Sequence, residues 1–101
     1  VIGIDEAQFF FDLPDFLLKM ENCNKIIIVA GLDGDFRRNP FGKILECIPL
    51  ADNVTKLSAM CNICKDGTSG IFSKKLYRND DIIDVGSNDK YYAVCRKHYI
   101  E

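Results

Sequence analysis

Three cysteines and the single histidine of the chain form two close pairs that could bind a metal ion. Cys61 and Cys64 make a CxxC pair, and Cys95 and His98 make a CxxH pair, with 30 residues between the pairs. Two-residue spacing lets both ligands approach one ion from a tight turn, and two pairs complete the tetrahedron of thiolate and imidazole ligands that Zn²⁺ favours. Four protein ligands leave no open coordination position, so we predict a structural zinc site. Scattered buried cysteines with an exposed histidine are the alternative.

Two adjacent carboxylates follow the apolar run VIGI at the start of the chain. Such a strand would deliver Asp5 to the C-terminal edge of a sheet, where a Walker B acid meets the Mg²⁺ of a bound nucleotide. Glu6 would lie near the same phosphates and accept a proton from an attacking hydroxyl or water. However, an acid after a strand is often only the cap of the next helix. The GxxxxGK[ST] loop that would decide the question is absent from these 101 residues.

The first half of the chain has the pattern of a βαβ unit, in which two parallel strands are joined through a helix. Residues 1–5 and 25–30 are short, β-branched apolar runs, typical of strands buried on both faces of a parallel sheet. Asp12 and Pro14 resemble the cap and first-turn proline of a helix between them. The expected apolar face of that helix is formed by Phe16, Leu17, Met20 and Cys23.

The chain then loses this pattern in two stages. The glycine-rich stretch 31–42 is predicted to be a loop at the C-terminal edge of the sheet, where open α/β sheets bind ligands. A short helix around 43–47, ended by Pro49, and a strand at 54–60 should follow. Beyond a boundary near residue 58 the apolar runs shorten, and GIFSKKLY and YYAVC read as strands of a small β module.

Composition indicates an ordered protein and excludes several classes. Hydrophobic residues make up 48% and charged residues 28% of the chain. A net charge of −2 gives no electrostatic footprint for binding a nucleic-acid backbone, and no run approaches the length of a membrane span. Paired metal-type cysteines and the lack of a leader favour a cytosolic setting. Cys23 and Cys47 fall outside the metal cluster and are predicted to be core residues.

Five stretches occur together here in a characteristic order and spacing. They are DEAQFF at 5–10, AGLDGDFRRNPFG at 30–42, LSAMCNIC at 57–64, FSKKL at 72–76 and VGSNDKYYAVCRKHY at 85–99. Taken together they resemble the C-terminal part of a thymidine kinase of the cytosolic, zinc-containing type found in animals, poxviruses and many bacteria. The resemblance covers essentially the whole chain.

The resemblance implies an α/β fold in two parts and a reaction. Residues 1–58 would be the C-terminal part of a RecA-like P-loop parallel-sheet domain. Residues 59–101 would be a small, ribbon-like zinc domain whose long excursion, the lasso, closes over the nucleoside. The family transfers the γ-phosphate of ATP to the 5′-hydroxyl of thymidine, in nucleotide salvage for DNA synthesis. It uses Mg²⁺ and structural Zn²⁺, usually assembles as a homotetramer (or dimer) in the cytoplasm, and implies neither a nucleic-acid nor a membrane partner.

The resemblance also implies roles for single residues. Glu6 would be the general base for the 5′-hydroxyl proton, and Asp5 would hold Mg²⁺ through water, with Ala7 and Gln8 beside them in the nucleotide site. Main-chain groups of the lasso would recognise the thymine edge while the loop excludes water. The residues implied to contact the nucleoside are Phe9, Leu32, Phe36, Ser73, Ile82, Ile83, Asp84, Val85, Gly86 and Tyr91. For Phe9, Leu32 and Phe36, an ordinary core position is the alternative.

Two other classes share part of this pattern. A DExx-box helicase or related ATPase would explain DEAQ and the SAM at 58–60, but its second motif should follow sooner, and no zinc pair should begin at the next residue. A non-enzymatic zinc-ribbon interaction module would explain the CxxC and CxxH pairs, but it leaves Asp5, Glu6 and the βαβ unit without a purpose. Because the chain begins inside an apolar run and lacks a phosphate-binding loop, we expect a fragment with no kinase activity of its own.

Overall fold

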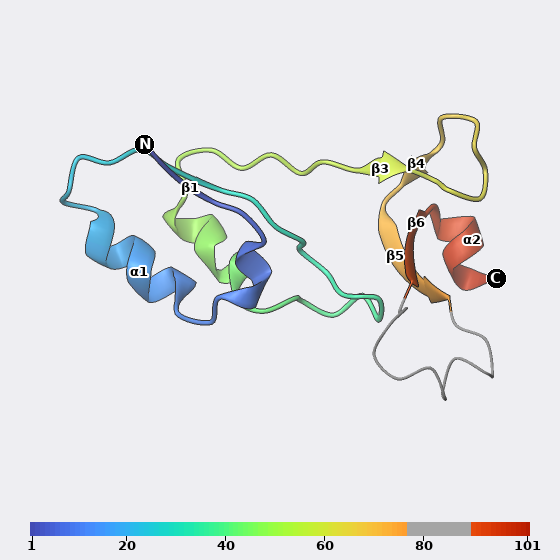
Figure 1. Ribbon diagram of the computed structural model, residues 1–101, viewed down its shortest axis with the longest axis horizontal. Coiled ribbons are helices and arrows are strands. Elements are labelled where there is room, and N and C mark those ends of the chain that lie inside the picture. The colour runs from blue at the N-terminus through green and yellow to red at the C-terminus, as the bar shows by residue number, and fades with distance from the viewer. Residues whose placement is uncertain (77–89) are drawn as a thin grey trace. The chain divides into compact units, whose positions relative to one another are not determined.

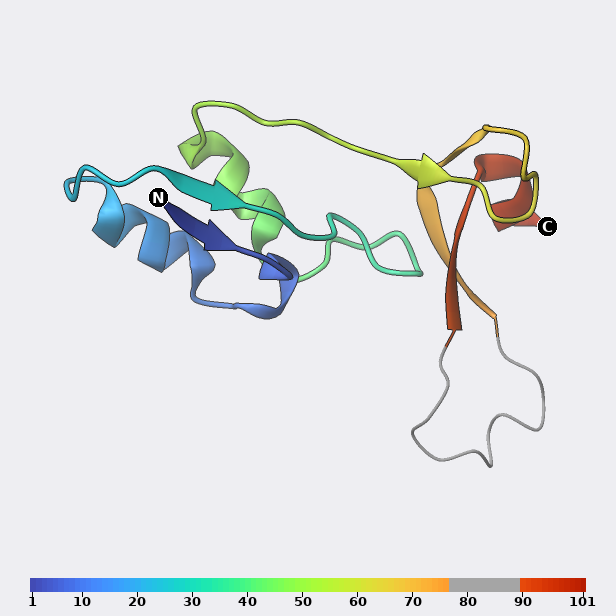
Figure 2. The same cartoon turned by 45° about the horizontal axis from the view of Figure 1, so that its top comes forward.

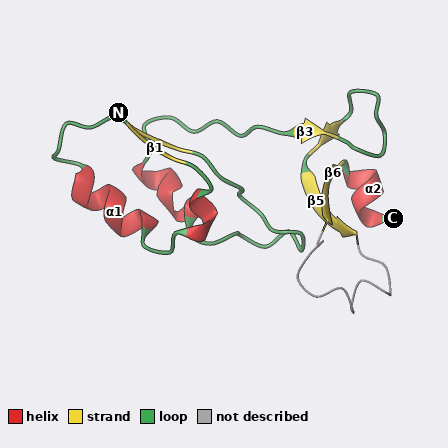
Figure 3. Cartoon of the chain, in the orientation of Figure 1, coloured by secondary structure: helices red, strands yellow, loops and turns green. Residues whose placement is uncertain are grey.

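The computed structural model describes residues 1–76 and 90–101, and the chain forms two compact units. Figures 1 and 2 trace it in two views, and Figure 3 distinguishes its helices, strands and loops. In the described ranges, no helix combines the length and the apolar character needed to cross a membrane. Unit 1 comprises Val1–Asp35 and Asn39–Thr55, and unit 2 comprises Phe36–Arg38 and Lys56–Glu101.

Unit 1 contains a parallel pair of strands joined through a helix. β1 is Ile2–Ile4, α1 is Leu13–Met20 and β2 is Ile27–Val29. The two strands pair in parallel, residue for residue along their length, so the predicted βαβ arrangement is confirmed. Two 3₁₀ helices complete the unit, η1 at Ala7–Phe9 directly after β1 and η2 at Ile44–Leu50.

The core of unit 1 lies on one side of this strand pair. Side chains alternate between the two faces of a strand, and Ile4 and Val29 point to the face that α1 and η2 cover. On the other face Ile28 is 60% exposed, so the prediction that both faces are buried is wrong for the part of the chain the structure describes. The residues of the core are Ala7, Leu13 and Cys47, with Ile4, Leu17, Val29 and Ile44 packed against them.

The helix predicted between the strands is present, but it is shorter than its apolar pattern suggested. Asp12 occupies the N-cap position and Pro14 lies in the first turn, as predicted. The helix ends at Met20, so the residues that follow do not continue its apolar face. Cys23 is consequently exposed, and its assignment to the core was wrong, whereas Cys47 is buried as expected.

Two further expectations need correction after the loop. The predicted helix at 43–47 is a 3₁₀ helix that continues through Pro49. A proline this close to a helix end sacrifices only one of the last hydrogen bonds. The predicted strand at 54–60 is wrong over most of its length, because only its last two residues, Ala59–Met60, pair with another strand among the residues that the structure describes. Leu57, in the unpaired part, is 83% exposed.

The described residues of unit 2 form two antiparallel strand pairs and a short helix. β3, Ala59–Met60, pairs with β4, Ser69–Gly70, and β5, Phe72–Leu76, pairs with β6, Lys90–Val94. The strands predicted in GIFSKKLY and YYAVC are therefore confirmed. The helix α2, Arg96–Ile100, was not predicted. It packs against β5 and β6.

Part of the predicted architecture stays a prediction. The described residues contain three sheets of two strands each, of which only β1–β2 is parallel. Two parallel strands do not define a RecA-like sheet. The same holds for the division into a kinase part at 1–58 and a zinc domain at 59–101, although the compact units also part close to that point, between Thr55 and Lys56.

Candidate active site and metal centre

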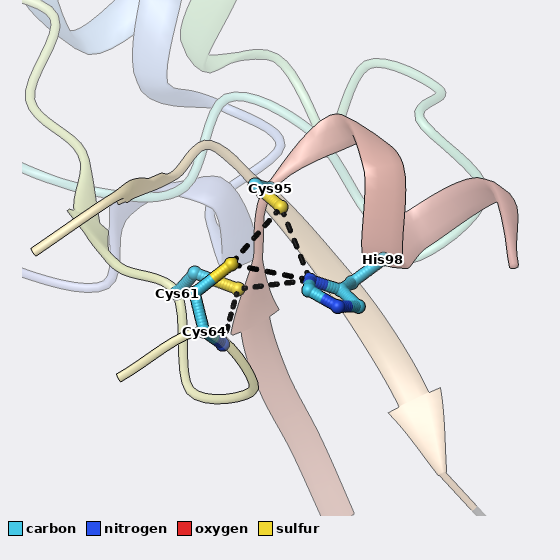
Figure 4. Close-up of side chains that lie close together, drawn as sticks. All are labelled: Cys61, Cys64, Cys95 and His98. Carbon is cyan, nitrogen blue, oxygen red and sulfur yellow. Dashed lines mark hydrogen bonds between the residues drawn. The ribbon is translucent and has the colours of Figure 1, made fainter. Parts of the chain in front are cut away.

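The four predicted metal ligands are brought together in unit 2 by two short structures. Cys61 follows β3 and opens a tight turn in which the Lys65 N–H donates to its carbonyl oxygen at 3.1 Å. Cys95 caps α2, and His98 lies three residues later on the same side of that helix. The two CxxH ligands are therefore positioned by the first turn of a helix, and the two CxxC ligands are positioned by a loop (Figure 4).

The distances between the ligand atoms suit a tetrahedral zinc ion. All four lie within 4.8 Å of one another. The Sγ atoms of Cys64 and Cys95 are 3.8 Å apart, and the His98 Nδ1 lies 3.3 Å from each of them and 3.7 Å from the Cys61 Sγ. Zinc bonds of about 2.3 Å to sulfur and 2.0 Å to nitrogen require ligand separations of roughly 3.5 to 3.8 Å in a tetrahedron. The observed separations are close to these values, so the four groups could bind Zn²⁺.

The four groups also affect one another's ionisation. Burial opposes ionisation of Cys61, but the N–H groups of Cys64, Cys95 and Ile63 and the His98 ring lower the pKa of its thiol to about 6. Burial, followed by the sulfur atoms of Cys61 and Cys95, raises the pKa of Cys64 to about 11. One thiolate here disfavours a second. A divalent cation relieves this repulsion, because it stabilises the thiolate form of every cysteine ligand.

In unit 1, the two adjacent carboxylates stand at the C-terminal end of β1, and both are exposed. Asp5 accepts the N–H of Glu6 at 2.8 Å through Oδ1. Glu6 has φ 53° and ψ 39°, a left-handed conformation that is uncommon for a residue with a side chain. The chain is then hydrogen-bonded to the residue that follows β2, since the Ala7 N–H donates to the Ala30 carbonyl oxygen at 3.0 Å. Strain of this kind is frequent at functional sites, and here it fixes the direction in which Glu6 leaves the strand.

Gln8 connects this carboxylate pair with the loop that follows β2. It is 1% exposed. Its Nε2 donates to Oε2 of Glu6 at 3.3 Å, and its Oε1 accepts the N–H of Leu32 at 3.0 Å. The predicted base and the predicted nucleoside contact Leu32 are thereby joined through one side chain.

The aromatic and apolar residues predicted to surround a thymine ring are found in both units. In unit 1, Phe9 and Leu32 are 58% and 49% exposed, so neither is an ordinary core residue in the described chain. Phe9 packs edge-on against Phe41, with ring centroids 5.4 Å apart.

In unit 2, Phe36 lies beside Tyr91, with ring centroids 6.0 Å apart. Tyr91 is opposite Lys75 in the β5–β6 pair, and Ser73, two residues from Lys75, is on the same face of that pair. Phe36, Ser73 and Tyr91 therefore gather on one side of unit 2. The other predicted nucleoside contacts, Ile82, Ile83, Asp84, Val85 and Gly86, lie outside the described residues.

Three further residues around Phe36 were missed in the sequence. The Tyr99 hydroxyl donates to the Phe36 carbonyl oxygen at 2.6 Å, and the guanidinium of Arg38 lies 4.5 Å from the centre of the Tyr99 ring. The ammonium of Lys75 lies 5.3 Å from the centre of the Phe36 ring. The only available signal was the alternation of basic and aromatic residues in DFRRNPF and RKHY, which does not by itself predict contact.

Fold and site together define an α/β protein with two adjacent acids at the end of a parallel strand and a separate Cys₃His metal centre. A family model described as "Thymidine kinase" matches residues 1–99. The chain belongs to the thymidine kinase family.

Individual relatives agree with this assignment. A thymidine kinase of vaccinia virus (strain Western Reserve) is 52% identical over 101 residues, which are 100% of this chain and 56% of that protein. A thymidine kinase of myxoma virus (strain Lausanne) is 52% identical over 99 residues, 98% of this chain and 54% of that protein. A thymidine kinase of Oryza sativa subsp. japonica is 51% identical over 102 residues, 100% of this chain and 37% of that protein. The chain thus spans about half the length of the viral relatives. The helicase and zinc-ribbon alternatives find no support among these matches.

Proposed function

We propose that the protein containing this chain is a thymidine kinase, which transfers the γ-phosphate of ATP to the 5′-hydroxyl of thymidine and yields dTMP for DNA synthesis. The observation that carries the proposal is the family match over residues 1–99, which includes the two acids after β1. Full-length relatives with about 52% identity carry the same name.

In this proposal the two acids have separate tasks. Glu6 accepts the proton of the 5′-hydroxyl as the hydroxyl attacks. An exposed carboxylate on a residue with a defined backbone conformation supports this role. Asp5 would hold Mg²⁺ through water, and the ion would neutralise charge on the phosphates of ATP. Ala7 and Gln8 complete the nucleotide side of the site.

The nucleoside would contact the residues that the family resemblance implies. Phe9, Leu32 and Phe36 would surround the thymine ring, and closure of the lasso over it would exclude water and limit ATP hydrolysis. The exposure of Phe9 and Leu32 supports this role, because a large apolar side chain left at the surface is available to a ligand. The other proposed contacts are Ser73, Ile82, Ile83, Asp84, Val85, Gly86 and Tyr91.

The metal centre would bind Zn²⁺ and stabilise unit 2. Three thiols and one imidazole are the ligands of a structural site, and their number leaves no position for a reacting group. We further propose that residues 1–58 belong to a RecA-like P-loop domain and 59–101 to the zinc domain with its lasso. The family's homotetramer (or dimer) in the cytoplasm is the expected assembly.

The proposal is tested by replacing the base in the full-length protein. Glu6→Gln keeps the shape of the side chain but removes its basicity, so kcat for thymidine phosphorylation should fall by about 10² to 10⁴-fold. The thymidine KM should change far less, because binding does not depend on proton transfer. Deoxycytidine is the control substrate. A rate near that of the wild type would show that Glu6 is not the base.

A further inference from the structure

Gln8 lies between the loops that follow the two parallel strands, and its side chain bonds to both. The amide nitrogen donates to the carboxylate of Glu6, and the amide oxygen accepts the main-chain N–H of Leu32. Chemistry allows only this orientation, because an ionised carboxylate can only accept a hydrogen bond and a main-chain N–H can only donate one. Glu6 and Leu32 are therefore held at a fixed separation.

The surroundings of Gln8 prevent it from turning away from these partners. Its side chain is buried, and a methyl group at Gly31 would come within 2.6 Å of its Oε1. On the main-chain side, a methyl group at Gly42 would overlap the carbonyl oxygen of Gln8. Both glycines thus stand where only a hydrogen atom fits beside Gln8. Glu6 itself is exposed.

We propose that Gln8 is a positioning residue for the phosphate-transfer reaction: it holds the Glu6 carboxylate in the place where the nucleoside hydroxyl must arrive. The inference rests on the proposed function, in which Glu6 is the base and Leu32 contacts the thymine ring. An exposed glutamate samples several rotamers, and a misplacement of about 1 Å can cost about 10²-fold in rate. Because Gln8 is buried, it acts through Glu6 rather than by touching the reacting atoms.

The decisive variant is Gln8→Glu in the full-length protein. It keeps an oxygen for the Leu32 N–H but replaces the donor to Glu6 with a second carboxylate. We expect kcat to fall by about 10- to 100-fold, with a smaller change in the thymidine KM. The acidic limb of the kcat profile should move to higher pH by about one unit or more, because adjacent carboxylates disfavour ionisation of both. The variant leaves the hydrogen bond from the Glu6 N–H to the Asp5 carboxylate in place.

A double variant shows whether the effect passes through Glu6. If Gln8 works only by placing that carboxylate, Gln8→Glu should cost nothing further in the Glu6→Gln background. Losses that multiply in the double variant, or a Gln8→Glu enzyme with the kcat and pH profile of the wild type, would overturn the inference. The position of the pH limb does not depend on the fraction of enzyme that folds.

Gly31→Ala tests the same inference without changing Gln8 and replaces the first variant if that one does not fold. Its methyl group would come within 2.6 Å of Oε1 of Gln8, and also within 2.8 Å of Cδ1 of Ile44 and 3.0 Å of the Ala7 main-chain nitrogen. Because Oε1 is the nearest of these atoms, Gln8 should be displaced and kcat per folded molecule should fall. Gly34→Ala is the matched control from the same loop, since its methyl group would lie 3.6 Å from the nearest described atom, the Asn39 carbonyl oxygen. Equal kcat in the two variants would contradict the inference.

Failure of the inference is distinguishable from failure of the proposed function. If Glu6→Gln retains the wild-type rate, the base is elsewhere and the proposed function needs revision. If Glu6→Gln is inactive while Gln8→Glu and Gly31→Ala match the wild type, only the positioning role of Gln8 is wrong.

Discussion

At the scale of single residues, the two cysteines outside the metal centre show how burial changes one type of side chain. Cys23 is exposed, while Cys47 lies on η2, is buried in the cluster that includes Leu13 of α1, and has its thiol 3.6 Å from the Lys43 carbonyl oxygen. Burial, with a smaller contribution from the Glu46 carboxylate, raises the pKa of Cys47. Reaction with alkylating agents requires the thiolate and access, and Cys47 is short of both.

We therefore predict that iodoacetamide at pH 8 labels Cys23 in the folded protein well before Cys47, as measured by mass spectrometry of peptides. In denaturant both should react at similar rates, which is the control. The raised pKa of Cys47 also makes the free energy of unfolding depend on pH. Above the ordinary thiol pKa of about 8.5, Cys47 ionises in the unfolded chain but stays neutral in the folded chain. The free energy of unfolding should therefore fall as the pH rises above that value. Equal labelling of both cysteines in the folded protein would contradict the burial of Cys47.

The residue types of the site were predictable from the sequence, but their connections were not. Spacing alone indicated Cys61, Cys64, Cys95 and His98, because soft ligands in close pairs have few other uses. The position of Asp5 and Glu6 at the end of a strand was predicted from the apolar run that precedes them. Gln8 was placed beside them, but its hydrogen bond to Leu32 joins residues 24 positions apart and depends on the parallel pairing of β1 with β2.

At the scale of elements, a predicted strand formed where a second strand was in place to pair with it. The runs that became β1, β2, β5 and β6 all found a neighbouring strand. The stretch 54–60 has a similar composition, but within the described residues it pairs only at its end. A high β-propensity does not form a strand where no neighbouring strand offers hydrogen bonds. The helix α2 escaped prediction because five residues carry too little periodicity to indicate a helix.

One prediction concerns the junction between η1 and the loop that precedes η2. Gly42 has φ +63°, and a methyl group there would overlap the main-chain oxygen of Gln8. Gly42→Ala should destabilise unit 1 by more than the roughly 1–2 kcal/mol that a left-handed conformation alone costs. Chemical denaturation measures the change. Gly3→Ala, whose methyl group would meet no described atom within 4 Å, is the control and should stay close to the wild type. Equal stabilities would show that the chain does not pass this close to Gln8.

At the scale of the whole molecule, the two units differ in what holds them together. Unit 1 has a cluster of buried apolar side chains around Leu13. In unit 2 the buried apolar residues of the described chain are Cys61, itself a predicted metal ligand, and Val94. A structural zinc ion can supply about 10 to 16 kcal/mol of apparent binding energy in small modules, so unit 2 should depend on it.

We therefore predict that a strong chelator unfolds unit 2 while β1 and β2 keep their hydrogen bonds. Hydrogen exchange read by mass spectrometry should show lost protection in β5, β6 and α2. Added Zn²⁺ should restore protection, and added Mg²⁺, which prefers oxygen ligands, should not. Retained protection of β5 and β6 in protein shown to be free of zinc would refute the structural role of the metal centre.

We proposed above that the acids after β1 serve phosphate transfer to a nucleoside. The most direct measurement is ³¹P NMR of the products when the full-length protein is given ATP, Mg²⁺ and thymidine. We expect ADP and thymidine 5′-monophosphate in equal amounts, with far less product from deoxycytidine. Free phosphate released without a nucleotide product, and faster when nucleic acid is added, would contradict it and would favour a helicase-type ATPase.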